Sequence, residues 1–131
     1  MTPAHVASRG DLPRVLLVDD DAALRAALQF ALQLDGLSVE TFASAEDLLE
    51  RADVTGVGCL VLDQNLPGMT GLDLLAVLRR GEVTTPALLI TTHPAASLRR
   101  RAEAADVEIV EKPLISDALL RSVLNLVAAR R

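Results

Sequence analysis

Aromatic side chains are almost absent from this chain. Phe, Trp and Tyr make up 2% of its 131 residues, whereas hydrophobic residues make up 50%. A hydrophobic core must therefore be built from Leu, Val, Ile and Ala. A chain of this length is expected to form one domain that buries roughly two thirds of its unfolded surface.

Cysteine and long apolar runs are also scarce. The single cysteine, Cys59, cannot form a disulfide within the chain, so we expect a reduced thiol in a cytoplasmic protein. No apolar run approaches the ~20 residues that a membrane-spanning helix needs. The first residues lack a basic segment followed by an apolar one, which argues against a secretory signal. We therefore expect a soluble, intracellular protein without a membrane partner.

Positive charge is in short supply as well. Thirteen Lys and Arg residues stand against eighteen Asp and Glu residues, which gives a formal net charge of -5. Affinity for DNA or RNA comes largely from Lys and Arg side chains that neutralise phosphates. We therefore expect no direct contact with nucleic acid. The basic run at 99–101 is expected to be a solvated helix face, and the alternative is a docking patch for an acidic partner or a second copy of the domain.

Short apolar runs alternate with helix-like segments along the chain. The predicted strands are 14–19, 38–42, 58–63, 87–91 and 107–111. The predicted helices are 22–35, a second one that Ser44 caps, 70–81, 96–105 and a last one that Ser116 caps. Strict alternation predicts an α/β fold, with a parallel sheet covered by helices on both faces. This unit fills residues 14–131, and residues 1–13 are predicted to be a flexible leader.

Polar residues and apolar stripes define the helices. Ser44 and Thr70 are favourable N-cap residues, and Gly36 is a usual helix-ending residue. The apolar stripe of the first helix is formed by Leu24, Ala27, Leu28, Ala31, Leu32 and Leu34. Leu48 and Leu49 are expected to form the inner face of the second helix. The last helix has its stripe at Leu119, Leu120, Val123, Leu124 and Val127.

Polar side chains collect where four of the predicted strands end. Asp19, Asp20 and Asp21 follow the first strand, and the third, fourth and fifth strands run into Asp63, Thr91 and Lys112. Ligands of parallel α/β sheets bind outside the carboxyl ends of the strands, so these side chains should meet in one crevice. Neighbouring carboxylates favour a divalent cation such as Mg²⁺. The three consecutive aspartates could instead serve only as helix-capping residues, so two interpretations stay open here.

The ordered set of motifs resembles the receiver domain of two-component response regulators. The resemblance is carried by Asp19-Asp20, Asp63, the loop 67–71, Thr91 and Lys112-Pro113, and it covers residues 14–130. It implies the flavodoxin-like receiver fold, a five-stranded parallel sheet in the order 2-1-3-4-5, doubly wound with five helices. A cis peptide bond before Pro113 is also typical of similar proteins.

The resemblance assigns roles to the residues of the crevice. Asp63 would accept a phosphoryl group from a histidine kinase, a histidine phosphotransfer protein or a small donor, in a Mg²⁺-dependent reaction. The implied metal ligands are Asp20, Asp63 and the main-chain carbonyl of Asn65, with Asp19 acting indirectly. Thr91 and Lys112 would contact the phosphoryl group, and Thr92 and His93 are candidate modulators beside it.

The resemblance also implies how such a domain acts. It would be a phospho-acceptor switch that catalyses only its own phosphorylation and dephosphorylation. The switch would act in trans or as the receiver part of a longer transcriptional regulator. Similar receivers meet their phosphodonor partner through the first helix, here near Leu24. A homodimer through the fourth helix, the fifth strand and the fifth helix is a further implied partner.

Two features depart from the family pattern, and two other functions stay open. Ile109 stands where many receivers carry Tyr or Phe, so a rotating aromatic ring cannot report phosphorylation. The glycine often found before the fifth strand is replaced around Ala105 and Asp106. One alternative is a haloacid-dehalogenase-like phosphatase, because Asp19-Asp20-Asp21 also fits its aspartate motif. The other is a docking receiver that is not phosphorylated.

Overall fold

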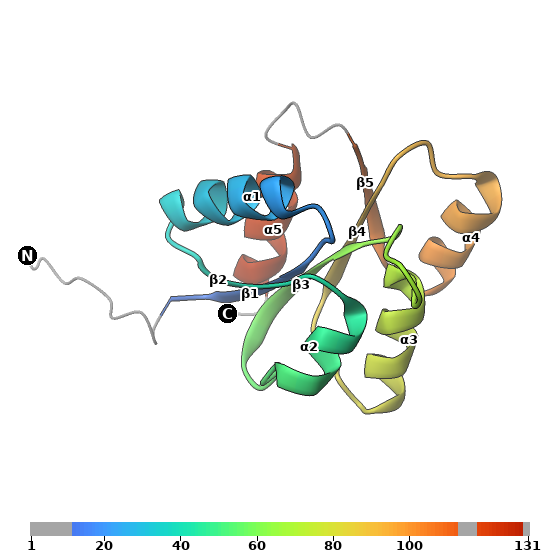
Figure 1. The fold of residues 1–131 in the computed structure, drawn as a ribbon, viewed down its shortest axis with the longest axis horizontal. Helices are drawn as coiled ribbons and strands as arrows, with labels where there is room; N and C mark the ends of the chain where they lie inside the picture. The colour runs from blue at the N-terminus through green and yellow to red at the C-terminus, as the bar shows by residue number, and fades with distance from the viewer. Residues whose placement is uncertain (1–11, 113–117, 130–131) are drawn as a thin grey trace, which may run out of the picture.

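The chain alternates between strands and helices throughout, as predicted. The computed structural model describes residues 12–112 and 118–129 (Figure 1). The strands are β1 (Arg14–Val18), β2 (Ser38–Phe42), β3 (Val57–Asp63), β4 (Ala87–Thr91) and β5 (Glu108–Glu111). The helices are α1 (Ala22–Leu34), α2 (Ala45–Arg51), α3 (Gly71–Arg80), α4 (Ala96–Ala104) and α5 (Ala118–Ala129). The predicted leader falls almost entirely outside the described residues, as do Pro113 and Ser116.

The five strands form one parallel sheet in the order β2-β1-β3-β4-β5, which confirms the predicted fold class and strand order. Val18 at the end of β1 is paired with Phe42 on β2 and Leu62 on β3. Thr91 at the end of β4 is paired with Glu111 on β5. The carboxyl ends of all five strands therefore lie along one edge of the sheet.

The sheet separates two hydrophobic cores. On β1, Leu16 and Val18 belong to the core beneath α2, α3 and α4, whereas Val15 and Leu17 belong to the core beneath α1 and α5. Figure 1 shows the same division of the helices between the two faces. Both faces of the central strands are buried, which explains why they are continuous apolar runs in the sequence.

Side-chain caps begin three of the helices. Asp21 at α1, Ser44 at α2 and Thr70 at α3 each accept a hydrogen bond from the main-chain N–H three residues further on, at 3.1, 3.0 and 3.1 Å. The predicted caps Ser44 and Thr70 are confirmed. Helix α4 begins without such a bond, because its N-cap residue is Ala95.

The predicted inner faces of α1 and α2 need correction. Leu34 of α1 is 71% exposed, and Leu49 of α2 is 39% exposed, although Leu48 is buried as predicted. Helix α1 turns Arg25 and Gln29 partly inward, where they donate hydrogen bonds to the main-chain oxygens of Asp19 and Val39. These two bonds fix the rotation of α1 and leave part of its apolar stripe exposed.

The helices are short. Within the part of the chain that the structure describes, the longest helix is α1, with 13 residues. Across residues 12–112 and 118–129, no helix combines the length and apolar character that crossing a membrane requires.

Candidate functional site

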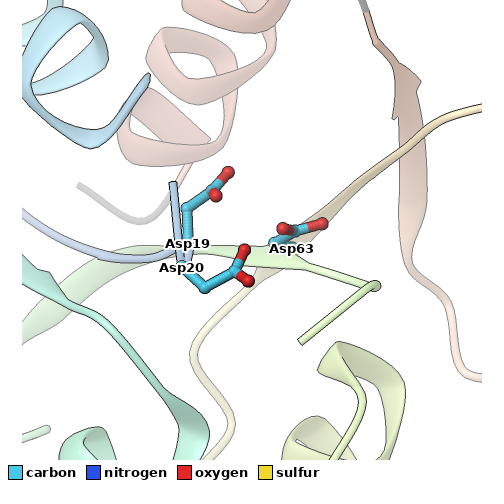
Figure 2. Close-up of side chains that lie close together, drawn as sticks. All are labelled: Asp19, Asp20 and Asp63. Atoms are coloured by element: carbon cyan, nitrogen blue, oxygen red, sulfur yellow. The ribbon is translucent and has the colours of Figure 1, made fainter. Parts of the chain in front are cut away.

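Three carboxylates meet where β1 and β3 end. Asp19 and Asp20 directly follow β1, and Asp63 is the last residue of β3 (Figure 2). One carboxylate oxygen from each of the three lies within 4.8 Å of the others. The sheet therefore brings together the acidic residues that the sequence analysis selected. Asp21 caps α1 and is not part of the cluster.

Lys112 joins the acidic cluster from the end of β5. Its Nζ atom lies 3.3 Å from Oδ2 of Asp63 and 3.5 Å from Oδ2 of Asp19. Burial opposes the charge on Lys112, but the two carboxylates outweigh it and raise the pKa of the amine above its ordinary value. Lys112 is also the only lysine of the chain, a signal that the sequence analysis did not use.

The Asp19 carboxylate is fully buried, and one of its two oxygens accepts a hydrogen bond from the described residues. Its Oδ1 atom accepts a hydrogen bond from the Asp21 N–H at 2.9 Å. Its Oδ2 atom accepts none from the described residues, since Lys112 lies at ion-pair distance but outside good hydrogen-bond geometry. A buried carboxylate oxygen without a donor, beside two further carboxylates, fits a hard divalent cation.

The environment of Asp19 acts on its pKa in both directions. Burial has the largest effect and raises the pKa, and the negative charge of Asp63 adds to it. The Asp21 N–H and the Lys112 ammonium lower the pKa, but the balance stays above the ordinary value. A bound cation would favour the ionised carboxylate.

Asn65 links Asp63 to Thr91. The Asn65 N–H donates to Oδ1 of Asp63 at 3.1 Å, and the Asn65 side-chain amide donates to Oγ1 of Thr91 at 3.3 Å. Thr91 is buried, and its main-chain oxygen accepts from the Lys112 N–H at 2.7 Å. The predicted switch residues Thr91 and Lys112 are thus joined through the backbone of neighbouring strands.

The two candidate modulators lie on the surface. Thr92 and His93 are both exposed in the loop between β4 and α4. His93 has a φ of 45°, a left-handed backbone conformation that is uncommon for a residue other than glycine. Neither side chain makes a hydrogen bond with the described residues.

The loop between β3 and α3 supports Asp63 through Gln64, which the sequence analysis did not select, and through Gly71, which it named only as part of the family-typical loop 67–71. Oε1 of Gln64 accepts a hydrogen bond from the Leu72 N–H at 2.9 Å. A Cβ atom at Gly71 would lie only 2.5 Å from the main-chain oxygen of Asp63. Glycine is therefore required where α3 begins, because its backbone passes against that of the acidic residue.

The two departures from the receiver pattern have structural consequences. Ile109 is half-buried and packs against the core beneath α4. Next along the edge of the sheet, Glu111 forms an ion pair with Arg99 of α4. Asp106 has a φ of 58°, so an aspartate adopts the left-handed conformation before β5 for which glycine is usual.

Known proteins resemble this chain over most of its length. The model of the response regulator receiver domain matches residues 15–124. The C4-dicarboxylate transport transcriptional regulatory protein DctD of Pseudomonas aeruginosa is 40% identical over 121 residues, which cover 90% of this chain and 26% of DctD. The transcriptional regulatory protein FixJ of Bradyrhizobium diazoefficiens is 33% identical over 106 residues, which cover 80% of this chain and 52% of FixJ. The chain thus spans between about a quarter and a half of these relatives.

Solved structures share the same fold. The response regulator StyR superposes with a TM-score of 0.81 at 38% identity, covering 92% of this chain and 63% of StyR. The chemotaxis protein CheY4 of Vibrio cholerae superposes with a TM-score of 0.78 at 28% identity, covering 88% of this chain and 98% of CheY4. The family model accounts for most of the sequence, and the fold agrees with it. The chain therefore belongs to the family of response regulator receiver domains.

Proposed function

We propose that this receiver domain is a switch that is phosphorylated on Asp63. The observation that carries the proposal is the position of Lys112, whose ammonium lies 3.3 Å from Asp63 and 3.5 Å from Asp19. Phosphoryl transfer asks a protein mainly to position the reactants and to neutralise the charge on the phosphoryl oxygens. A carboxylate beside an ammonium and a cation-binding cluster suits both tasks.

In the proposed reaction, a carboxylate oxygen of Asp63 forms a bond to phosphorus. The bond between phosphorus and a histidine nitrogen of the donor protein breaks, and the nitrogen keeps its electron pair. Lys112 neutralises charge on the phosphoryl group. The Thr91 hydroxyl, released from the Asn65 amide, donates a hydrogen bond to one phosphoryl oxygen. The domain acts on no other substrate than its own aspartyl phosphate and the donor.

The acidic cluster is proposed to hold Mg²⁺. Asp20, Asp63 and the main-chain oxygen of Asn65 would be the ligands, and Asp19 would act indirectly. Mg²⁺ supplies positive charge against the oxygens of the transferred group. The buried Asp19 Oδ2 atom without a hydrogen-bond donor supports a cation at this place. Thr92 and His93, exposed beside the crevice, are proposed to control the access of water to the phosphoryl group.

Intact-mass spectrometry tests the acceptor. Wild type incubated with acetyl phosphate and MgCl₂ should gain one phosphoryl group, and EDTA should prevent the gain. Asp63→Asn should gain none. Asp53→Asn is the matched control. Oδ1 of Asp53, like Oδ1 of Asp63, accepts a hydrogen bond from the main-chain N–H two residues further on, but Asp53 lies outside the site. A phosphoryl group on Asp63→Asn, or its loss from Asp53→Asn, would contradict the assignment.

The outward face of α1 is proposed to bind the phosphodonor protein. Phe30 is 65% exposed and Leu34 is 71% exposed, and they lie one helical turn apart. Leu24, where similar receivers meet their phosphodonor partner, is half-buried here, so we place the proposed surface at Phe30 and Leu34 instead. Phe30→Ser should slow phosphotransfer from a histidine kinase that phosphorylates wild type, with no change in the reaction with acetyl phosphate. Equal slowing with both donors would contradict a docking role.

The output of the switch is proposed to run through α4, β5 and α5. An open groove of about 930 Å³ crosses these elements, with Arg99, Glu108 and Leu126 among its lining residues. DctD and FixJ are transcriptional regulatory proteins of which this chain spans 26% and 52%, so residues 14–131 are proposed to be the receiver part of such a protein or to act in trans. Sedimentation velocity with and without acetyl phosphate tests whether phosphorylation drives a homodimer.

A further inference from the structure

We propose that Arg25 of α1 is a positioning residue for the cation site. Its Nη1 atom donates a hydrogen bond of 2.7 Å to the main-chain oxygen of Asp19, the residue directly before Asp20. The inference rests on the proposed function, because the residue that Arg25 positions, Asp20, is a proposed metal ligand. Arg25 would thus contribute to the cation site without being one of the proposed metal ligands.

The backbone of Asp19 is held on both sides. Its N–H donates to the Phe42 oxygen at 3.1 Å, and its oxygen accepts from Arg25. Arg25 is itself held near the loop, since its own N–H donates to the Asp21 oxygen at 2.9 Å. The peptide that leads into Asp20 is therefore fixed between β2 and the second turn of α1.

Asp20 is the carboxylate that most needs this support. Asp19 is held by the Asp21 N–H, and Asp63 is held by the Asn65 N–H and by Lys112. The exposed Asp20 side chain has no hydrogen bond or ion pair with residues 12–112 or 118–129. Its place in the cluster consequently depends on its backbone, and the Arg25 bond fixes that backbone.

The partly inward position of Arg25 supports a dedicated role. Arginine is rarely buried unless its charge is paired, yet Arg25 is half-buried beside Leu24 and Leu28. Within the described residues, the Asp19 oxygen is the hydrogen-bond acceptor of its guanidinium. A hydrogen bond from a charged donor is short and strong, which suits a clamp on a single peptide.

Electrostatics and positioning predict opposite effects for the loss of Arg25. A cation site is repelled by a nearby guanidinium, so the loss of its charge alone would tighten Mg²⁺ binding. Loss of the clamp would weaken binding, because Asp20 would no longer be held in place. The sign of the change in Mg²⁺ affinity therefore separates the two effects.

An NMR titration of ¹⁵N-labelled protein with MgCl₂ measures that sign and shows at once whether each variant is folded. Arg25→Gln should raise the Mg²⁺ dissociation constant by about tenfold, as outer-shell substitutions do at other metal sites. Arg25→Lys keeps the positive charge and part of the length of the side chain. Its Mg²⁺ dissociation constant should therefore lie between those of wild type and Arg25→Gln. At saturating MgCl₂, phosphorylation of Arg25→Gln by acetyl phosphate should approach the wild-type rate.

Arg14 provides the matched control. Its guanidinium also donates to main-chain oxygens, those of Thr55 and Asp53 at 3.0 and 3.1 Å, but at the opposite end of β1. Arg14→Gln should leave the Mg²⁺ dissociation constant unchanged, whatever it does to stability. An equal loss of affinity in Arg14→Gln would reduce the Arg25 effect to general destabilisation.

Two other outcomes are distinguishable. Unchanged or tighter Mg²⁺ binding by folded Arg25→Gln overturns the positioning role while leaving the proposed function intact. Failure of wild type to bind Mg²⁺ or to gain a phosphoryl group overturns the proposed function itself.

Discussion

A single lysine serves the acidic cluster, although the chain contains thirteen Lys and Arg residues. An ammonium is a compact charge on a flexible stem, whereas a guanidinium is a wide planar fork. Lys112 places that compact charge between Asp63 and Asp19, which lie on different strands. The rest of the molecule uses arginine, as in the main-chain contacts of Arg14 and Arg25.

The single lysine makes its ionisation directly measurable. NMR of protein carrying ¹⁵N at the lysine amine should give a pKa above the ordinary 10.5 for Lys112, because two carboxylates outweigh the effect of burial. Asp19→Asn should lower that pKa, since it removes one of the two charges and leaves the burial. Asp53→Asn, remote from the amine, should leave it unchanged. A value at or below the ordinary one in wild type would contradict the described geometry.

At the scale of elements, α4 is attached to the core through small apolar contacts. Ala102 is its buried residue, its N-cap makes no side-chain hydrogen bond, and grooves open on both of its sides. Its polar contacts are the ion pair from Arg99 to Glu111 and a longer one from Arg101 to Asp73, at 3.9 Å. These ion pairs therefore add to the apolar packing of Ala102 and the half-buried Leu98 in attaching the helix.

The Arg99–Glu111 pair should control the local opening of α4. Arg99→Gln and Glu111→Gln should each speed amide hydrogen exchange in α4, and the double variant should add nothing further. An exposed pair contributes about 0.2–1 kcal/mol, so the change should be a few-fold and should vanish at high salt. Arg100→Gln is the control, because this exposed neighbour forms no hydrogen bond or ion pair with the described residues. Equal exchange in wild type and Arg99→Gln would show that packing alone holds the helix.

The two ends of α3 differ in their tolerance of a side chain. Gly71→Ala should destabilise the protein by about 1–3 kcal/mol, because the new Cβ atom would meet the Asp63 backbone at 2.5 Å. Gly81→Ala, at the other end, has its nearest neighbour at 3.5 Å and a φ of -84°, and should be neutral or stabilise by about 0.4–1 kcal/mol. Urea unfolding of both variants measures the difference. Equal costs at the two ends would contradict the close approach of α3 to Asp63.

Helix α1 shows where prediction from the sequence reached its limit. Its caps could be predicted, because Asp21 and Gly36 are local signals. The face of α1 that turns toward the core could not be predicted. Ala and Leu occur all around the helix, and polar residues such as Arg and Gln are expected to face water. Arg25 and Gln29 turn partly inward to bond main-chain oxygens of Asp19, directly after β1, and of Val39 on β2, and the periodicity of the helix itself contains no sign of these contacts.

At the scale of the whole molecule, alternation of strands and helices was enough to predict the fold class. It also placed Asp63, Thr91 and Lys112 at one edge, because parallel strands end together. The strand order came from the resemblance to receiver domains and is confirmed. The support from Gly71 and Gln64 could not be predicted, since it depends on how closely two backbones pass after folding.

The buried Cys59 links the stability of the molecule to alkaline pH. Burial, with a smaller effect of Glu108, raises the pKa of this thiol from 9.0 to about 12. Above pH 9 the unfolded chain loses the proton while the folded chain keeps it, so stability falls as the pH rises toward 12. By roughly pH 10.5 the loss should be about 2 kcal/mol.

Urea unfolding across this pH range measures that loss. Cys59→Ala should be less stable at pH 8 but should lose less stability between pH 8 and pH 10.5. The raised pKa of Lys112 also reduces stability at still higher pH, and it does so in both proteins. Parallel pH profiles for wild type and Cys59→Ala would show that the thiol ionises freely in the folded protein.

The sheet separates two hydrophobic cores, which are built on the same strands but from different side chains. Residues next to one another on β1, such as Leu16 and Leu17, belong to opposite compartments. Repacking beneath α4 can therefore proceed while the layer under α1 stays as it was. A molecule built this way can change shape on the α4 side of the sheet and still present the same α1 surface to a binding partner.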